Sequence, residues 1–342
     1  MTQILLASFY LIVPAIILFL CKKSSIIKKM GSIVVAYAIG ILLGISGILP
    51  EGSAQIQDLL ISLSIPLAIP LLLFPTKIKD WAELAGPSLK ALLVGLISVV
   101  VIVFVGYFLF KPDESENFWK VGALLIGVYS GGTPNLASLK AMLQVSNETY
   151  IVIHSYDDDL FDKLFNKKSF IPLLKAFGLA LLIFGISAGF ASLFPPDYLM
   201  IVVILSLSTL ALAASFIPGV NKIDKSFDLG MYFILVFSVT VASLINPKEL
   251  VAASLDLIYY PAFVIFGSLL LQSLISRFTK TDADTLIITS TALICSPPFV
   301  PVVCSAINNR NLLVPGITIG VIGYAIGNYL GFLVGEALKI FG

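Results

Sequence analysis

The sequence has few charged residues, and this shortage excludes most classes of soluble protein. Only 12% of its 342 residues are charged, whereas 58% are hydrophobic, and the mean hydropathy is +1.03. Because soluble domains are about half apolar and a quarter charged, this composition indicates an integral membrane protein. The 20 acidic and 21 basic residues nearly balance, so the basic excess expected of a nucleic-acid-binding protein is missing.

Histidine and cysteine are also scarce. The single histidine excludes a multi-histidine metal centre, and three cysteines give neither zinc-site spacing nor an even disulfide framework. The motifs H-E-x-x-H and G-x-S-x-G and a pair of intramembrane aspartates are missing from the sequence. We therefore expect no enzyme and no cofactor, apart from a coupling ion, Na⁺ or H⁺.

Long apolar runs fill the chain instead. A spanning helix needs about 20 apolar residues, and only helices satisfy the backbone of such a segment in lipid. The first run has no basic residue before it, unlike a secretory signal. The sequence predicts an all-α integral membrane protein with about 11 transmembrane helices. The runs are Met1–Cys21, Gly31–Leu49, Leu59–Pro75, Pro87–Phe110, Trp119–Leu143, Phe170–Phe194, Tyr198–Ile217, Leu229–Ile245, Leu257–Ser276, Thr285–Ile307 and Leu312–Ile340.

The basic residues predict an orientation. With eleven spans and the N-terminus outside, seventeen of the 21 basic residues, Lys339 among them, fall on the cytoplasmic side. We therefore expect a multi-pass protein of the plasma membrane with a cytoplasmic C-terminus. The four basic residues expected outside are Lys111, Lys120, Lys248 and Arg310.

One polar segment, residues 147–168, interrupts the apolar pattern. It contains Asp157, Asp158, Asp159 and Asp162, and each charge costs about 2.5–3.5 kcal/mol at the centre of a span. We therefore expect it not to cross the bilayer. If it re-enters the protein, Asp157 and Asp158 could bind a coupling ion; otherwise the segment is a solvated loop.

Two stretches of the sequence share a plan. Leu59–Leu143 and Leu229–Ile307 each consist of one span, a second smooth span and a span interrupted by small polar residues. They start five spans apart, and an odd offset implies opposite orientation. This predicts a leading helix with its basic loop (residues 1–30) and two inverted five-helix repeats, residues 31–195 and 196–342. Inverted repeats are typical of secondary transporters.

Each repeat has one interrupted helix. Glycine pairs and prolines break a helix, and the freed backbone groups then need partners or a ligand. Two such breaks at matching places favour a binding site where the two discontinuous helices cross, whereas a single break is more often a mere kink. Glycines recur every three or four residues on Leu312–Ile340, which indicates a packing face. The candidate substrate- or ion-binding residues are Ser130, Gly131, Gly132, Thr133, Asn135, Thr289, Thr291, Ser296 and Asn328.

Two motifs resemble a known family. The run Gly131-Gly132-Thr133-Pro134-Asn135 and the run Val321–Gly331 resemble the domain of unknown function 819 family, a group of membrane proteins. That family is grouped with the superfamily of sodium/proton antiporters and bile-acid symporters. The resemblance implies a core domain with two crossed broken helices and a panel domain. The polar segment 147–168 departs from the family pattern, which has an apolar span there.

These features together predict a secondary active transporter that works by alternating access. We expect it to be coupled to sodium or protons and to move a small solute, with an anionic one favoured by half-helix N-termini. The competing class is a channel or a non-transporting membrane scaffold or accessory protein. The expected partners are the lipid bilayer and the solute, with a homodimer as the assembly to consider and no nucleic acid.

Overall fold

The computed structural model describes residues 2–24, 27, 32–50, 52–76, 87–112, 117–146, 170–223, 225–244, 256–295 and 300–341. Each of the eleven predicted apolar runs contains an α-helix, and no strand occurs within the described ranges. Seven helices in these ranges are long and apolar enough to cross a membrane. The prediction of an all-α integral membrane protein is thus confirmed.

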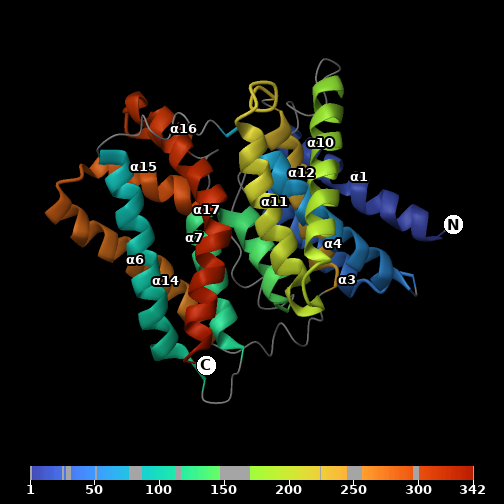
Figure 1. Cartoon of the computed structure of the whole chain (residues 1–342), viewed down its shortest axis with the longest axis horizontal. Helices are drawn as coiled ribbons and strands as arrows, with labels where there is room; N and C mark the ends of the chain where they lie inside the picture. Colours follow the sequence, from blue (N-terminus) through green and yellow to red (C-terminus); the bar gives the residue numbers. More distant parts are fainter. Residues whose placement is uncertain are drawn as a thin grey trace. The chain divides into compact units, whose positions relative to one another are not determined.

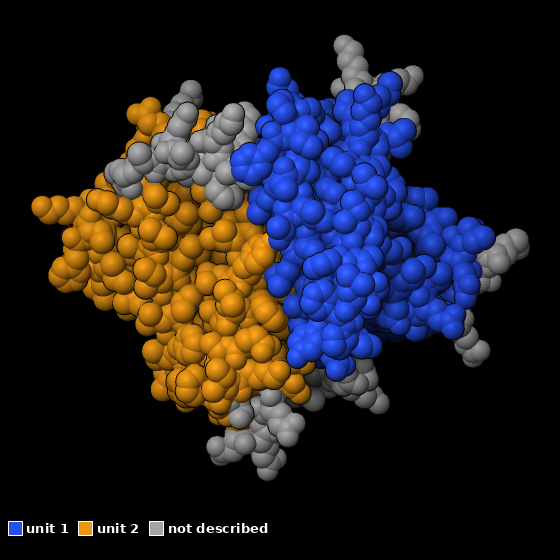
Figure 2. All heavy atoms as spheres, in the orientation of Figure 1, with its two compact units in different colours: residues 1–77, 146–151, 156–252 blue, residues 78–145, 152–155, 253–342 orange. Residues whose placement is uncertain are grey.

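The chain forms two compact units (Figures 1 and 2). Each unit takes helices from both halves of the sequence, so the units differ from the sequence divisions 1–30, 31–195 and 196–342. Unit 1 holds α1 (Thr2–Lys23), α3 (Ser32–Ile45), α4 (Ser53–Leu73), α10 (Phe170–Ala191), α11 (Leu199–Ser215) and α12 (Ser226–Ala242). Unit 2 holds α6 (Pro87–Phe110), α7 (Phe118–Leu143), α14 (Asp256–Thr279), α15 (Ala283–Ile294), α16 (Val300–Ala306) and α17 (Leu313–Lys339).

In unit 1, α4 and α12 pack side by side and run in opposite directions. Gly230, near the start of α12, lies against Leu72, near the end of α4. At the other end, Gln57 Nε2 donates to the hydroxyls of Tyr10 and Ser243, both at 2.8 Å, and all three side chains are buried. This network satisfies the polar groups where α1, α4 and α12 meet, as a buried carboxamide requires.

In unit 2, α6, α14 and α17 are long helices without a break. Helices α6 and α14 are antiparallel, because the Tyr260 hydroxyl near the start of α14 donates to Val103 O, 2.7 Å away, near the end of α6. Helix α17 ends beside the end of α6, where Lys111 Nζ donates to Phe341 O at 2.9 Å. We call the end of unit 2 where α6 begins and α14 ends "end 1". The opposite end, where α6 and α17 finish, is "end 2".

The structure corrects the prediction that Trp119–Leu143 is a spanning helix. A Cβ on Gly127 would lie 3.3 Å from backbone atoms of Asn135, although residues eight apart in a straight helix are about 12 Å apart. Gly331 of α17 likewise faces both Ala123 and Leu139. Helix α7 therefore folds back on itself, and both its ends lie at end 2. We call residues 118–143 hairpin 1.

The run Thr285–Ile307 does not span either. Asn309 Nδ2, just after α16, donates to Asp284 Oδ2, in the first turn of α15, at 2.8 Å. Gly316 of α17 faces both Ile288 of α15 and Val300 of α16. Helix α15 thus starts and α16 ends at end 1, and we call α15 and α16 together hairpin 2. Two interrupted helices were predicted, but they are hairpins entering from opposite ends of unit 2, not crossed spans.

The C-terminal end of α17 and the segment after α6 lie at the same end of unit 2. Besides the bond between Lys111 and Phe341, the ammonium groups of Lys120 and Lys339 lie 5.8 and 5.4 Å from the centre of the same Trp119 ring. The predicted orientation placed Lys111 and Lys120 outside and Lys339 in the cytoplasm. That part of the prediction is wrong, because all three lysines lie at the same end of unit 2.

Candidate functional site

The turn of hairpin 1 is made by two glycines. Gly131 has φ −165° and ψ 19°, and Gly132 has φ 58° and ψ −146°, so the helix is interrupted there as the sequence predicts. Only glycine adopts the Gly132 conformation without strain. Pro134 follows and has no N–H, so it cannot donate to Ser130 O, four residues earlier. The tip of hairpin 1 therefore presents a backbone carbonyl that lacks its usual helical donor.

The Asn135 side chain fixes this tip against α17. Its Nδ2 donates to Gly323 O at 2.9 Å, and the residue is 2% exposed. A side chain on Gly131 or Gly327 would overlap the Asn135 carboxamide, and one on Gly323 would overlap Ser130 O. The glycines of α17 thus let hairpin 1 pack directly on its backbone, which confirms the predicted packing face.

Gln272 of α14 joins the two hairpins. Its Oε1 accepts from the Tyr129 hydroxyl in hairpin 1 and from the Ser290 hydroxyl in hairpin 2, both at 3.0 Å. Gln272 is fully buried, and a Cβ on Gly95 of α6 would lie 3.1 Å from its Nε2. A single carboxamide oxygen therefore connects Tyr129, two residues before the glycine turn, with Ser290 of α15.

Gly323 is a second meeting point. Its α-carbon faces Ser130, at the tip of hairpin 1. A Cβ on Gly323 would also lie 3.1 Å from Leu293 Cδ2, close to the end of α15. The two hairpins therefore enter from opposite ends of unit 2 and reach the same turn of α17. We call this group the junction; it consists of Tyr129, Ser130, Gln272, Ser290 and Gly323.

The structure places the predicted site residues as follows. Ser130, Gly131, Gly132, Thr133 and Asn135 are buried in the turn of hairpin 1, Thr289 is buried on α15, and Asn328 is buried on α17. The Thr291 hydroxyl donates to Ile287 O at 2.8 Å, within its own helix. Ser296, Asp157 and Asp158 lie outside the described residues, as does the rest of 147–168.

Sequence reasoning missed Gln272. The residue sits in the run predicted as the smooth span Leu257–Ser276, directly after Leu269, Leu270 and Leu271. A buried amide is costly in lipid unless it is paired, so an isolated glutamine in such a run is itself a signal of an interhelical contact. Its partners could not be read from the sequence, because they lie on α7 and α15.

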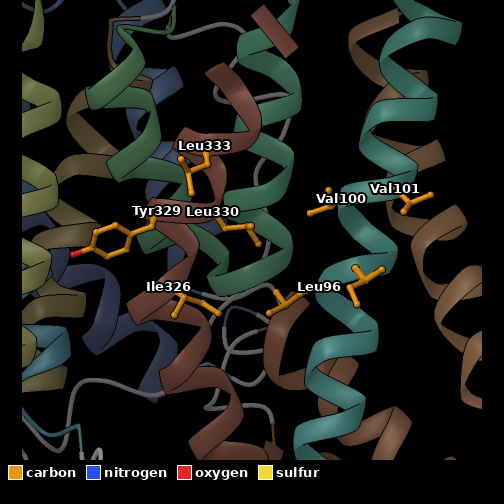
Figure 3. A pocket seen from close by; sticks show the side chains of 8 residues that line it. Leu96, Val100, Val101, Ile326, Tyr329, Leu330 and Leu333 are labelled. Atoms are coloured by element: carbon orange, nitrogen blue, oxygen red, sulfur yellow. The ribbon is translucent and has the colours of Figure 1, made fainter. Parts of the chain in front are cut away.

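Each unit has an apolar groove that differs from the junction. In unit 2 a groove of about 400 Å³ lies between α6 and α17, and in unit 1 one of about 490 Å³ lies between α10 and α11. Figure 3 shows the first of them, where Tyr329 turns away from α6 and aliphatic side chains form the walls. Such walls suit lipid or another apolar surface.

Fold and site define an integral membrane protein with two facing helical hairpins. Comparison with known proteins identifies its family. The family model described as "Protein of unknown function (DUF819)" matches residues 8–161 and 162–341. The chain therefore belongs to this family. It is also similar to the uncharacterized membrane protein YjcL of Bacillus subtilis (strain 168). The two are 23% identical over 346 residues, which cover 86% of each chain.

Proposed function

We propose that this membrane protein is a secondary transporter that binds its solute at the junction. The observation that carries the proposal is the meeting of two interrupted hairpins from opposite ends of unit 2 at Gln272 and Gly323. Non-helical backbone within a membrane is tolerated where it is buried in protein or lines a cavity. Such backbone beside polar side chains is a recurring plan of transporter sites.

The inverted order of elements supports alternating access. Along the chain, α4, α6 and hairpin 1 are followed later by α12, α14 and hairpin 2. Within unit 1, α4 is antiparallel to α12, and within unit 2, α6 is antiparallel to α14. The hairpins also enter unit 2 from opposite ends. A site between inverted elements can be opened from either side by equivalent movements.

The junction favours sodium over protons as the coupling ion. Its five residues include hydroxyls, a carboxamide and the Ser130 carbonyl, but no carboxylate that could titrate. The first half of hairpin 1 ends there, and the partial negative charge of a helix C-terminus favours a cation. The second half begins there, and its N-terminus favours an anionic group of the solute.

The charges of unit 1 support an external N-terminus. Gln3 Nε2 donates to Gln55 Oε1, so the start of α1 lies at the start of α4. Lys225 directly precedes α12, which starts at the other end of α4. Basic residues favour the cytoplasm, so α1 starts outside. Residues 77–86, between α4 and α6 in the sequence, include Lys77 and Lys79, so we infer from the preference of basic residues for the cytoplasm that α6 starts on that side. Helix α6 then begins in the cytoplasm, and end 2 with the C-terminus lies outside.

Reconstitution in proteoliposomes tests the proposal. A mixture of labelled small carboxylates, sugars and amino acids is offered with an inward sodium gradient, an inward proton gradient or neither. Saturable uptake that depends on the sodium gradient is expected. Conductance without saturation would indicate a channel instead, and no flux with any member of the mixture would favour a scaffold.

A further inference from the structure

Helix α14 has a buried polar face. Ser268, Gln272 and Ser276 follow each other at intervals of four residues and therefore lie on one side of the helix. They are 0%, 0% and 3% exposed. Phe266 and Leu270, on the opposite side, are 72% and 64% exposed, as expected of residues that face lipid. The polar face is thus turned into unit 2.

Two polar atoms on this face lack hydrogen-bond partners in the part of the chain that the structure describes. They are Gln272 Nε2 and Ser276 Oγ. Thr289 Oγ1 on α15, which packs against α14, also lacks a hydrogen-bond partner among the described residues. Leaving a buried polar group unpaired costs about 1–3 kcal/mol, and leucine or alanine at these places would avoid it. Packing alone therefore does not explain the polar face.

The position of this face suggests its use. Ser276 lies one turn before the end of α14 at end 1, and Gln272 lies one turn deeper, at the junction. On α15, Thr289 and Ser290 lie at the same depth as Gln272, since the Ser290 hydroxyl donates to Gln272 Oε1. Polar atoms thus lead from end 1 of unit 2 to the meeting point of the hairpins.

We propose that the polar face of α14, together with α15, is the route by which the solute passes between end 1 and the junction. This rests on the proposed transport function and adds the route and a substrate class. Gln272 Nε2 can only donate, so the solute presents oxygen acceptors, as a carboxylate or a carbonyl compound does. In this structure the route is closed, because Gln272 and Ser276 are buried.

Cysteine accessibility tests the route without knowledge of the substrate. Cys21, Cys295 and Cys304 are first replaced by serine, and Ser276→Cys, Gln272→Cys and Ser273→Cys are then made one at a time. Ser273 is the matched control, because it neighbours Gln272 in sequence but is exposed on the outer side of α14. The probe is a charged, membrane-impermeant methanethiosulfonate reagent applied to either side of sealed vesicles.

The thiolate, which forms in water but not in lipid, attacks the sulfur of the reagent, forms a mixed disulfide and releases methanesulfinate. Ser276→Cys is expected to react at least about tenfold faster than Ser273→Cys, from the end 1 side only, with Gln272→Cys intermediate. Equal rates for Ser276→Cys and Ser273→Cys, or reaction of Ser276→Cys from end 2, would overturn the route. This outcome is independent of the uptake assay, which alone decides whether the protein transports.

A second measurement tests the substrate class once an uptake signal exists. Gln272→Glu keeps an acceptor for Tyr129 and Ser290 but replaces the donor by a carboxylate oxygen. Uptake of an oxygen-acceptor solute is expected to fall at least tenfold in Gln272→Glu and to stay near the parent level in Ser273→Ala. Unchanged uptake in Gln272→Glu, with the protein folded, would show that Gln272 does not contact the solute.

Discussion

Replacing Gly323 by alanine is the sharpest test of the way the hairpins pack. The new methyl group would overlap Ser130 O and lie 3.0 Å from Ser130 C and 3.1 Å from Leu293 Cδ2. Because the obstructing atoms belong to a backbone turn, the tip of hairpin 1 has to move away from α17. That movement also strains the bond from Asn135 Nδ2 to Gly323 O.

The magnitude follows from three contributions. Overpacking costs about 1–3 kcal/mol, and loss of the Asn135 hydrogen bond costs about 1 kcal/mol. Alanine offsets up to about 1 kcal/mol through its higher helix propensity. The net loss of about 1–3 kcal/mol corresponds to a fall in the unfolding midpoint of roughly 1–4 °C for a chain of this length.

The assay is thermal unfolding of the detergent-solubilised protein, followed by fluorescence-detected size-exclusion chromatography. Gly185→Ala on α10 is the matched control, because no atom lies within 4 Å of a Cβ at that position. It is expected to leave the midpoint unchanged or to raise it slightly. The packing described for hairpin 1 is refuted if Gly323→Ala unfolds at the same temperature as Gly185→Ala.

Three further outcomes are expected. Reporter fusions in residues 112–117 and after Phe341 should report the same side of the membrane, because Lys111 bonds to Phe341 O; opposite sides would contradict the hairpin geometry. Asn135→Leu should lower stability by about 1–3 kcal/mol, since Gly323 O loses a buried donor, and an unchanged unfolding midpoint would argue against this contact. Asp282 caps α15, and the Thr285 backbone N–H holds its pKa below the ordinary 3.8. Its stabilisation is therefore present above about pH 4 and lost as the pH falls through the lowered value, so Asp282→Asn should flatten the acid side of the stability profile.

The positions of the helices and of the first break were predictable from sequence. Apolar runs mark helices in lipid because their backbone must be satisfied internally, and Gly131-Gly132 followed by Pro134 cannot continue a helix. The repeated glycines of α17 also indicated a close backbone contact, which the structure shows against Ser130 and Asn135. These features are local, so the sequence carries them directly.

The direction of the chain after each break was not predictable in the same way. Hydropathy measures how apolar a run is, and a 26-residue run such as α7 is long enough either to cross or to return. The choice is made by contacts distant in sequence, such as Asp284 with Asn309 and Gly331 with both Ala123 and Leu139. The same holds for Gln272, whose partners lie on two other helices.

The hairpin geometry has a consequence for the chain between α7 and α10. Hairpin 1 ends at end 2, which the proposed orientation places outside. In unit 1, Phe177 of α10 stacks on Phe233 of α12, with ring centres 5.9 Å apart. Lys175, just before Phe177, is a basic residue and is therefore expected in the cytoplasm. The proposed orientation thus expects Gln144 outside and Lys175 in the cytoplasm, whereas residues 147–168, predicted not to cross the bilayer, lie outside the described residues.

Single cysteines at two exposed positions decide between these predictions. In a chain without its natural cysteines, Gln144→Cys is expected to react with an impermeant thiol reagent in intact cells, because it follows hairpin 1 on the outside. Lys175→Cys, near the start of α10, should react only after the cells are permeabilised. If both cysteines react from one side, the proposed orientation of one unit is wrong, and the proximity of Ala123 and Leu139 to Gly331 should then be tested by crosslinking.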